Sequence, residues 1–213
     1  MPAIIIIDSA APDEAAVARA AAIIKRGGVI AYPTETFYGL GADPFNERAV
    51  ERLFAIKGRN FDKPIPLIIG KRENLDGLVT DITREAELLI KHFWPGPLTL
   101  VFHAASHIHR AITADTGKVG IRLSSHRIAR NLATALPSGV LTATSANFSG
   151  SEAMNAAQDV LAAMGRLVDA VIEGGATPGG PGSSVIDVTA IPPVIIRNGE
   201  IPKEIISDKL RRI

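Results

Sequence analysis

The sequence contains no cysteine, few aromatic residues and almost no net charge. Without cysteine, the 213-residue chain forms no disulfide, no thiolate zinc site and no cysteine nucleophile. Lys and Arg number 23 and Asp and Glu 22, so the formal net charge is +1 and no global field attracts nucleic acid or a membrane surface. Any anion-binding site must therefore come from a local cluster of basic side chains.

Long apolar runs are also missing. The β-branched run Ile4–Ile7 is short, and no stretch approaches the ~20 apolar residues that a membrane-spanning helix needs. The first residues carry no basic leader of the kind that begins a signal peptide. A lack of disulfides is typical of reducing compartments. We therefore expect a cytoplasmic protein that does not associate with membranes.

What the chain does contain is an ordinary globular composition, with 46% hydrophobic and 21% charged residues. No linker, internal repeat or low-complexity segment divides it, so we predict one domain over residues 1–213. Short β-branched segments are interspersed with Ala-rich or amphipathic ones, which is typical of the α/β class. Because the alternation is not strictly strand–helix–strand, we expect a mixed sheet with flanking helices.

The expected elements follow hydrophobic periodicity and the positions of glycine and proline. Strands are predicted at Ile4–Ile7, Val29–Tyr32, Ile65–Ile69, Leu98–Phe102, Val119–Leu123, Val140–Ala143, Asp169–Ile172, Val185–Val188 and Val194–Arg197. Helices are predicted at Asp13–Arg26, Glu47–Ile56, Thr83–Phe93 and His126–Ala135, from an Asn155 cap through Met164, and in a short tail from Lys203. Residues Pro33–Pro44 are predicted to form a loop.

The first polar loop follows the strand predicted at Val29–Tyr32. In it, the hydroxyls of Thr34 and Thr36 flank the carboxylate of Glu35, and glycines follow soon after. Hydroxyls position small polar substrates, and glycines permit close approach of the backbone to a ligand. A turn with local threonine hydrogen bonds has the same composition.

A second loop carries basic groups suited to nucleotide phosphates. Lys57, Arg59 and Lys63 follow the helix predicted at Glu47–Ile56. A guanidinium binds phosphate through two parallel hydrogen bonds, and an ammonium acts as a point charge. Cations at this place also complement the dipole at a helix C-terminus. The sequence contains no P-loop pattern.

Two more loops are dense in small or hydroxyl residues. Ser145-Ala146-Asn147 follows an apolar strand, where backbone N–H groups and the serine suit phosphate oxygens. No G-x-S-x-G elbow surrounds Ser145, so it is not read as a hydrolase nucleophile. Gly174–Ser184 contains five glycines, which fits a lid, a backbone pressed against a ligand, or a plain flexible loop. Taken singly, the first three motifs fit ordinary turns or solvated loops better than sites.

Two other features are interpreted as structural. His107-Ile108-His109 has no neighbouring acids, and alternate spacing in a loop is a weak metal signal, so we expect a surface pair. Trp94 stands beside two prolines and is expected to pack in the core rather than to stack on a base.

The order of the loops is far more specific than any one of them. A strand followed by YPTETFYGLG, then KGR with DKP, SAN, a glycine-rich loop with SSVID and a strand ending in Arg197 resembles the YrdC/TsaC family over roughly Ala15–Asn198. The resemblance implies a single-domain, open twisted mixed sheet with flanking helices and a concave basic cavity. It also implies the short form, without the extra C-terminal domain of longer relatives.

An activity comes with the resemblance. Members of the family make threonylcarbamoyl-AMP and pyrophosphate from L-threonine, bicarbonate and ATP, as nucleotidyltransferases. The product feeds the formation of N6-threonylcarbamoyladenosine (t6A) in tRNA, so partner proteins that use it are expected. Mg²⁺ is expected to arrive with ATP rather than in a metal site of the protein, and weak direct RNA binding is a further expectation.

The resemblance also implies roles for individual residues. The family's K-x-R and S-x-N signature gives the expected catalytic residues Lys57, Arg59, Ser145 and Asn147. The expected threonine-binding residues are Thr34, Thr36, Arg122 and Ser183. The expected ATP-binding residues are Arg59, Lys63, Ser145, Asn147 and Arg197.

Two other functions remain open from the sequence. A non-catalytic RNA-binding module would explain the basic loop, although the chain lacks interleaved aromatics and has almost no net charge. A carbamoyl-transfer module, like the related domain of hydrogenase maturation factors, would use carbamoyl phosphate in place of threonine. Such factors carry further, cysteine-bearing domains, and this sequence has no cysteine.

Overall fold

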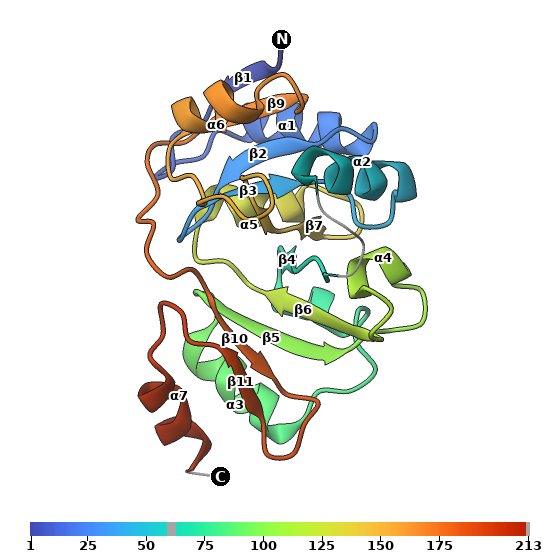
Figure 1. Cartoon of the computed structure of the whole chain (residues 1–213), viewed down its shortest axis with the longest axis vertical. Helices are drawn as coiled ribbons and strands as arrows, with labels where there is room; N and C mark the ends of the chain where they lie inside the picture. Colours follow the sequence, from blue (N-terminus) through green and yellow to red (C-terminus); the bar gives the residue numbers. More distant parts are fainter. Residues whose placement is uncertain (59–62, 212–213) are drawn as a thin grey trace.

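Two mixed β-sheets flanked by helices form the structure, a computed structural model that describes residues 1–58 and 63–211 (Figure 1). The first sheet has the order β1 (Ala3–Ile6), β9 (Ala170–Glu173), β2 (Ile30–Pro33), β3 (Tyr38–Gly41) and β8 (Thr144–Ser145). The second sheet has the order β11 (Val194–Arg197), β10 (Ser184–Asp187), β5 (Leu98–His103), β6 (Lys118–Arg122), β4 (Leu67–Ile69) and β7 (Val140–Thr142).

The helices begin and end at residues that suit those positions. They are α1 (Glu14–Lys25), α2 (Glu47–Lys57), α3 (Arg84–Phe93), α4 (Arg110–Thr113), α5 (Arg127–Thr134), α6 (Ala157–Met164) and α7 (Lys203–Leu210), with a 3-10 turn at Arg72–Leu75. The Asp13 carboxylate accepts hydrogen bonds from the first turn of α1, and Asn46 and Thr83 do the same for α2 and α3. Helix α2 ends at Gly58 in the left-handed conformation.

Apolar side chains fill both faces of the first sheet. Along β2, Ile30 and Tyr32 point into a cluster shared with α1 and α5, while Ala31 points into the cluster on the other face. That other cluster holds α2 and continues into the second sheet. Helix α5 packs on β2 of the first sheet and on β4 and β7 of the second, so it joins the two.

The register of the strands determines which polar residues meet. Strand β3 pairs with β8, which places Gly39 opposite Ser145. In the second sheet, β5 runs antiparallel to β6 and parallel to β10. Thr99, Arg122 and Ser183 therefore lie at the same end of the three neighbouring strands β5, β6 and β10, although they are far apart in the sequence.

The α/β class, the mixed strand directions and the flanking helices are confirmed, and each predicted strand and helix is found within a few residues of its predicted bounds. The strands divide between two sheets, which the sequence did not indicate. The single domain over residues 1–213 stays a prediction. Within residues 1–58 and 63–211, none of the helices has the length and hydropathy of a membrane-spanning segment.

Two predictions were wrong. Strand β3 lies where a loop was predicted, because Gly39 and Gly41 weaken the strand signal. Gly41 is nevertheless required there, since a Cβ atom would lie 2.8 Å from Tyr32 Cε1 on β2. Asn155 does not cap α6, which begins at Ala157 without a side-chain cap.

The cap of α2 gives a test of the fold. Replacing Asn46 by Ala removes the acceptor for the Ala49 N–H, so the free energy of unfolding should fall by about 1 kcal/mol in urea denaturation. Asn131→Ala, at an exposed position inside α5, is the matched control and should not lower stability. An equal loss in both variants would contradict the capping role.

Candidate functional site

A cavity of about 350 Å³ is lined by residues of both sheets. The first sheet and its β2–β3 loop contribute Thr34, the run Thr36–Gly39 and, with Thr144 and Ser145, the edge strand β8. The second contributes Thr99, Arg122 and Arg197. The wall therefore combines hydroxyls with two guanidinium groups, which suits a polar, anionic ligand.

The loop between β2 and β3 forms one wall of the cavity through two buried hydroxyls. Thr34 Oγ1 donates to the Phe37 carbonyl at 2.7 Å and lies 3.2 Å from Thr36 Oγ1. The local threonine turn and the cavity wall are thus the same structure. Because the Thr34 proton is committed to a carbonyl, Thr36 carries the hydroxyl better placed to serve a ligand.

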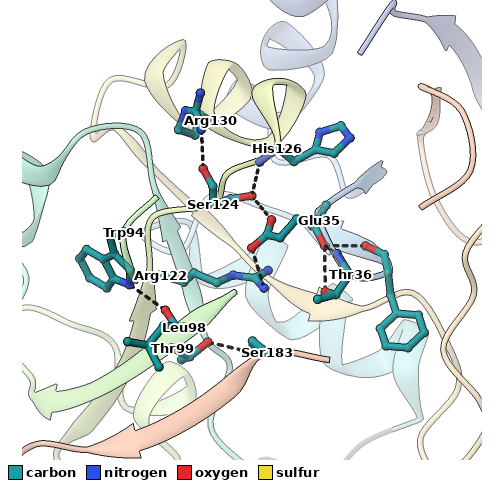
Figure 2. Close-up of polar contacts among 12 residues, drawn as sticks. Glu35, Thr36, Trp94, Leu98, Thr99, Arg122, Ser124, His126, Arg130 and Ser183 are labelled. Carbon is teal, nitrogen blue, oxygen red and sulfur yellow. Dashed lines mark hydrogen bonds and ion pairs between the residues drawn. The ribbon is translucent and has the colours of Figure 1, made fainter. Parts of the chain in front are cut away.

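Arg122 is the last residue of β6, and its side chain is only 7% exposed. Its Nη1 atom lies 3.1 Å from Glu35 Oε1, and Ser124 Oγ donates to the other carboxylate oxygen (Figure 2). A buried guanidinium is destabilising without a counter-charge, and Glu35 supplies it.

Arg197 reaches the cavity from β11 and is held by the residue before β10. Its Nε and Nη2 atoms donate to the Ser183 carbonyl and hydroxyl, each at 2.8 Å. Burial lowers the pKa of Arg197, and the positive charge of Arg122 lowers it further. The two arginines are therefore close enough to repel, and an anionic group between them would relieve that repulsion.

Ser183 is also coupled to β5, since its hydroxyl lies 3.0 Å from Thr99 Oγ1. The glycine-rich segment before it is anchored along its length: Gly179 N donates to the Thr36 carbonyl at 2.7 Å, and Thr177 N to the Asn155 carbonyl at 2.8 Å. This fits a backbone pressed against a ligand site better than a loose loop.

Tyr38 supports the same segment from β3. Its hydroxyl donates to the Gly175 carbonyl at 2.8 Å. Burial raises the pKa of Tyr38 to about 12, so the hydroxyl keeps its proton and this bond at physiological pH.

Lys57 and Asn147 contact each other at the edge of the site. The Lys57 ammonium donates to the Ser145 carbonyl at 2.5 Å, the Asn147 carbonyl at 3.1 Å and the Asn147 side-chain oxygen at 2.9 Å. Lys57 is 3% exposed, and the described cavity wall includes Ser145 but neither Lys57 nor Asn147. Lys57 therefore ties the end of α2 to the loop that carries Ser145.

The other predicted site residues are distributed as follows. Thr34, Thr36, Arg122, Ser145, Ser183 and Arg197 are brought together in the cavity wall. Lys63 is exposed and does not belong to that wall as described, and Arg59 lies outside the described residues. The catalytic and ligand-binding roles of these residues stay predictions.

Three contributors were not assigned from the sequence. Glu35 was noticed as a carboxylate between two hydroxyls, but nothing in the sequence linked it to Arg122. Thr99 and Ser124 lie near these groups only because of strand register and the start of α5. Arg122, which lies within an otherwise apolar predicted strand, was the one sequence signal for a carboxylate nearby, because a buried guanidinium needs a counter-charge.

Trp94 packs against the core as expected, and both histidines of the His107/His109 pair contact other residues of the chain, His109 lying 3.5 Å from Glu47. His107 stacks on Phe45, and His109 Nδ1 accepts from Ala111 N at the start of α4. In the described part of the chain, no group of three or more His, Asp or Glu side chains is placed to hold a metal ion. Trp94 packs against the core and donates to the Leu98 carbonyl at 2.7 Å.

Comparison with known proteins places this arrangement in a family. The model for Sua5, YciO and YrdC proteins, described as "Telomere recombination", matches residues 22–199. The threonylcarbamoyl-AMP synthase of Pyrococcus abyssi is 42% identical over 87% of this chain and 54% of its own length. The putative threonylcarbamoyl-AMP synthase of Mycobacterium leprae is 33% identical over 92% of this chain and 89% of its own length.

Solved structures give the same result. Pyrococcus abyssi Sua5 complexed with L-threonine has a TM-score of 0.92 and 40% identity, over 97% of this chain and 60% of that one. Escherichia coli YciO has a TM-score of 0.86 and 27% identity, over 94% and 97%. The chain spans about half the length of the curated Pyrococcus relative. The sequence motifs, the fold and these matches agree, and the chain belongs to the Sua5/YciO/YrdC family.

Proposed function

We propose that the chain makes threonylcarbamoyl-AMP and pyrophosphate from L-threonine, bicarbonate and ATP, for t6A formation in tRNA. The observation that carries the proposal is the cavity, whose wall brings Thr36 together with Arg122 and Arg197. Support comes from the fold, which matches that of a relative complexed with L-threonine at a TM-score of 0.92.

The reaction needs positioning and charge stabilisation rather than a covalent enzyme intermediate. The threonine amine adds to bicarbonate with loss of water and gives an N-carboxylate. That carboxylate attacks the α-phosphorus of ATP, and pyrophosphate leaves with the electron pair of the broken P–O bond. Hydroxyls and guanidinium groups of the kind found in the cavity wall suit such a site.

In this proposal the cavity has an amino-acid half and a nucleotide half. Thr34, Thr36, Arg122 and Ser183 serve L-threonine, and Ser145 and Arg197 serve ATP. Lys63 and Arg59 are assigned to the phosphates by family resemblance. Lys57 and Asn147 act by holding the loop that carries Ser145 at the cavity wall.

Magnesium enters this proposal with ATP. The described cavity wall contains hydroxyls, guanidinium groups and apolar side chains but no carboxylate, so it does not fit the oxygen cage of a resident divalent cation. Phosphate oxygens and water would hold the ion, and the residues of this chain would bind the phosphates.

The partners follow from the chemistry. ATP, L-threonine and bicarbonate are the substrates, and tRNA-modifying proteins that transfer the threonylcarbamoyl group consume the product. Weak RNA binding by the chain and a cytoplasmic location are also part of this proposal, because the product is used to modify tRNA.

Release of pyrophosphate is the direct test of the activity. The purified chain should release it from ATP only when L-threonine and bicarbonate are both present. Release that ignores threonine would refute the proposal, and productive use of carbamoyl phosphate in its place would favour a carbamoyl-transfer module. RNA binding that weakens with salt, without ATP turnover, would favour an RNA-binding module.

Thr36→Val tests the amino-acid half because it keeps the side-chain shape and removes the hydroxyl. We expect the KM for threonine to rise about tenfold or more, the loss of one hydrogen bond to a charged group, while the KM for ATP stays unchanged. Thr80→Val, at an exposed threonine outside the cavity, is the matched control. Equal effects on both substrates would remove Thr36 from this role.

Lys57→Met tests whether Lys57 acts through the Ser145 loop. It leaves buried oxygens without their donor, so the free energy of unfolding should fall by about 2 kcal/mol or more in urea denaturation. Activity should fall in parallel. Unchanged stability with abolished activity would instead mean that Lys57 contacts the substrates directly.

A further inference from the structure

Glu35 lies between two cavity-lining threonines but does not itself line the cavity. Thr34 and Thr36 belong to the wall, whereas the Glu35 carboxylate turns towards Arg122 and the segment that leads into α5 (Figure 2). The Glu35 side chain is 12% exposed, and its Oε1 atom is buried. Glu35 has no role in the proposed reaction so far.

The two carboxylate oxygens have different partners. Oε1 forms an ion pair with Arg122 Nη1 at 3.1 Å and, among the described residues, accepts no hydrogen bond. Oε2 accepts from Ser124 Oγ. Ser124 is itself fixed, because His126 N donates to its hydroxyl at 3.1 Å and Arg130 donates to its carbonyl at 2.8 Å. The start of α5 thus sets the position of the carboxylate.

This network sets the orientation of Arg122. A guanidinium presents its N–H donors in a rigid plane, so fixing one edge fixes the direction of the others. The Nη1 atom is drawn to the Glu35 carboxylate by the ion pair at 3.1 Å, and the same side chain forms part of the cavity wall. Without Glu35, the positive charges of Arg122 and Arg197 would also repel each other uncompensated.

Glu35 is poorly placed to take a proton from a substrate. A general base must come within hydrogen-bond reach of the proton that it removes. Its Oε1 atom has no exposed surface and its Oε2 atom is held by Ser124. Its effect on a ligand must therefore pass through Arg122.

We propose that Glu35 is a positioning residue for carboxylate recognition, which holds the Arg122 guanidinium in the orientation that receives the carboxylate of the amino-acid substrate. This inference rests on the proposed function and deepens it. Thr34 and Thr36 supply two hydroxyls to the cavity wall. Behind the wall, the Glu35 carboxylate orients the Arg122 guanidinium. Selection for an amino acid with a free carboxylate then depends on Glu35, which touches no substrate.

The test compares L-threonine with L-threoninamide, which lacks the carboxylate, by equilibrium binding to the folded chain. The wild-type protein should prefer threonine by about tenfold or more, the value of one charge-assisted hydrogen bond. In Glu35→Gln, which keeps the side-chain volume, most of this preference should disappear, because a neutral amide no longer anchors Arg122. The affinity for ATP should stay within about twofold of the wild-type value, well under one hydrogen bond.

Asp187→Asn is the matched control. Asp187 pairs with Lys118 at 2.8 Å, at the opposite end of β6 from Arg122, and its side chain is 15% exposed. The same carboxylate-to-amide change at a similarly enclosed ion pair should leave the threonine preference intact. A loss of preference in Asp187→Asn equal to that in Glu35→Gln would mean that weakening the second sheet suffices, and would overturn the inference.

Ser124→Ala keeps the proposal testable if Glu35→Gln does not fold. It removes only the hydroxyl that fixes the carboxylate, so we expect a smaller loss of preference, with thermal melting confirming a folded protein. The proposal would be overturned if Ser124→Ala, and Glu35→Gln where that variant folds, preferred threonine over threoninamide as strongly as the wild-type protein does.

Pyrophosphate release by the wild-type chain, measured in parallel, separates this inference from the proposed function. Threonine-dependent release without a carboxylate preference would retain the function and reject the role of Glu35. A carboxylate preference that depends on Glu35, without any release, would retain the role of Glu35 and reject the function.

Discussion

The buried ion pair between Glu35 and Arg122 joins the two sheets behind the cavity wall. Glu35 follows a strand of the first sheet and Arg122 ends a strand of the second, so the pair links the two sides of the cavity. Removing one partner of such a buried pair leaves an uncompensated charge, at a cost of about 3–5 kcal/mol. Loss of either charge would therefore disturb both the threonine side of the cavity and its arginine side.

Smaller contacts extend the same arrangement. Lys57 ties the end of α2 to the loop carrying Ser145, and Arg197 ties β11 to Ser183. Tyr38 and the Thr36 carbonyl hold the glycine-rich segment. Each contact joins different elements of the fold, and each fixes one part of the cavity wall. The cavity is thus organised before a ligand arrives, which is what a reaction that depends on positioning needs.

The sequence predicted features that depend on neighbouring residues, such as helices, strands and motifs. It did not predict contacts that depend on how distant strands and sheets meet. β-Branched runs and capping residues located the strands and helices, whereas β3 was missed because its alternate glycines, needed for packing on Tyr32, resemble a loop. The order of the polar motifs identified the family. The contact between Thr99 and Ser183 follows from the register of β5 and β10, and that between Glu35 and Arg122 from the way the two sheets meet. The Lys57 ammonium donates to carbonyls of the Ser145 loop, a contact that the sequence did not indicate, and its expected role towards phosphates stays a prediction.

The structure of the chain bound to L-threonine tests the central claim most directly. The account predicts that the threonine carboxylate lies within hydrogen-bond distance of Arg122, with the Glu35–Arg122 ion pair intact and the Thr36 hydroxyl next to the amino acid. Threonine bound elsewhere in the cavity, or an Arg122 side chain that has left Glu35 to reach it, would contradict the account.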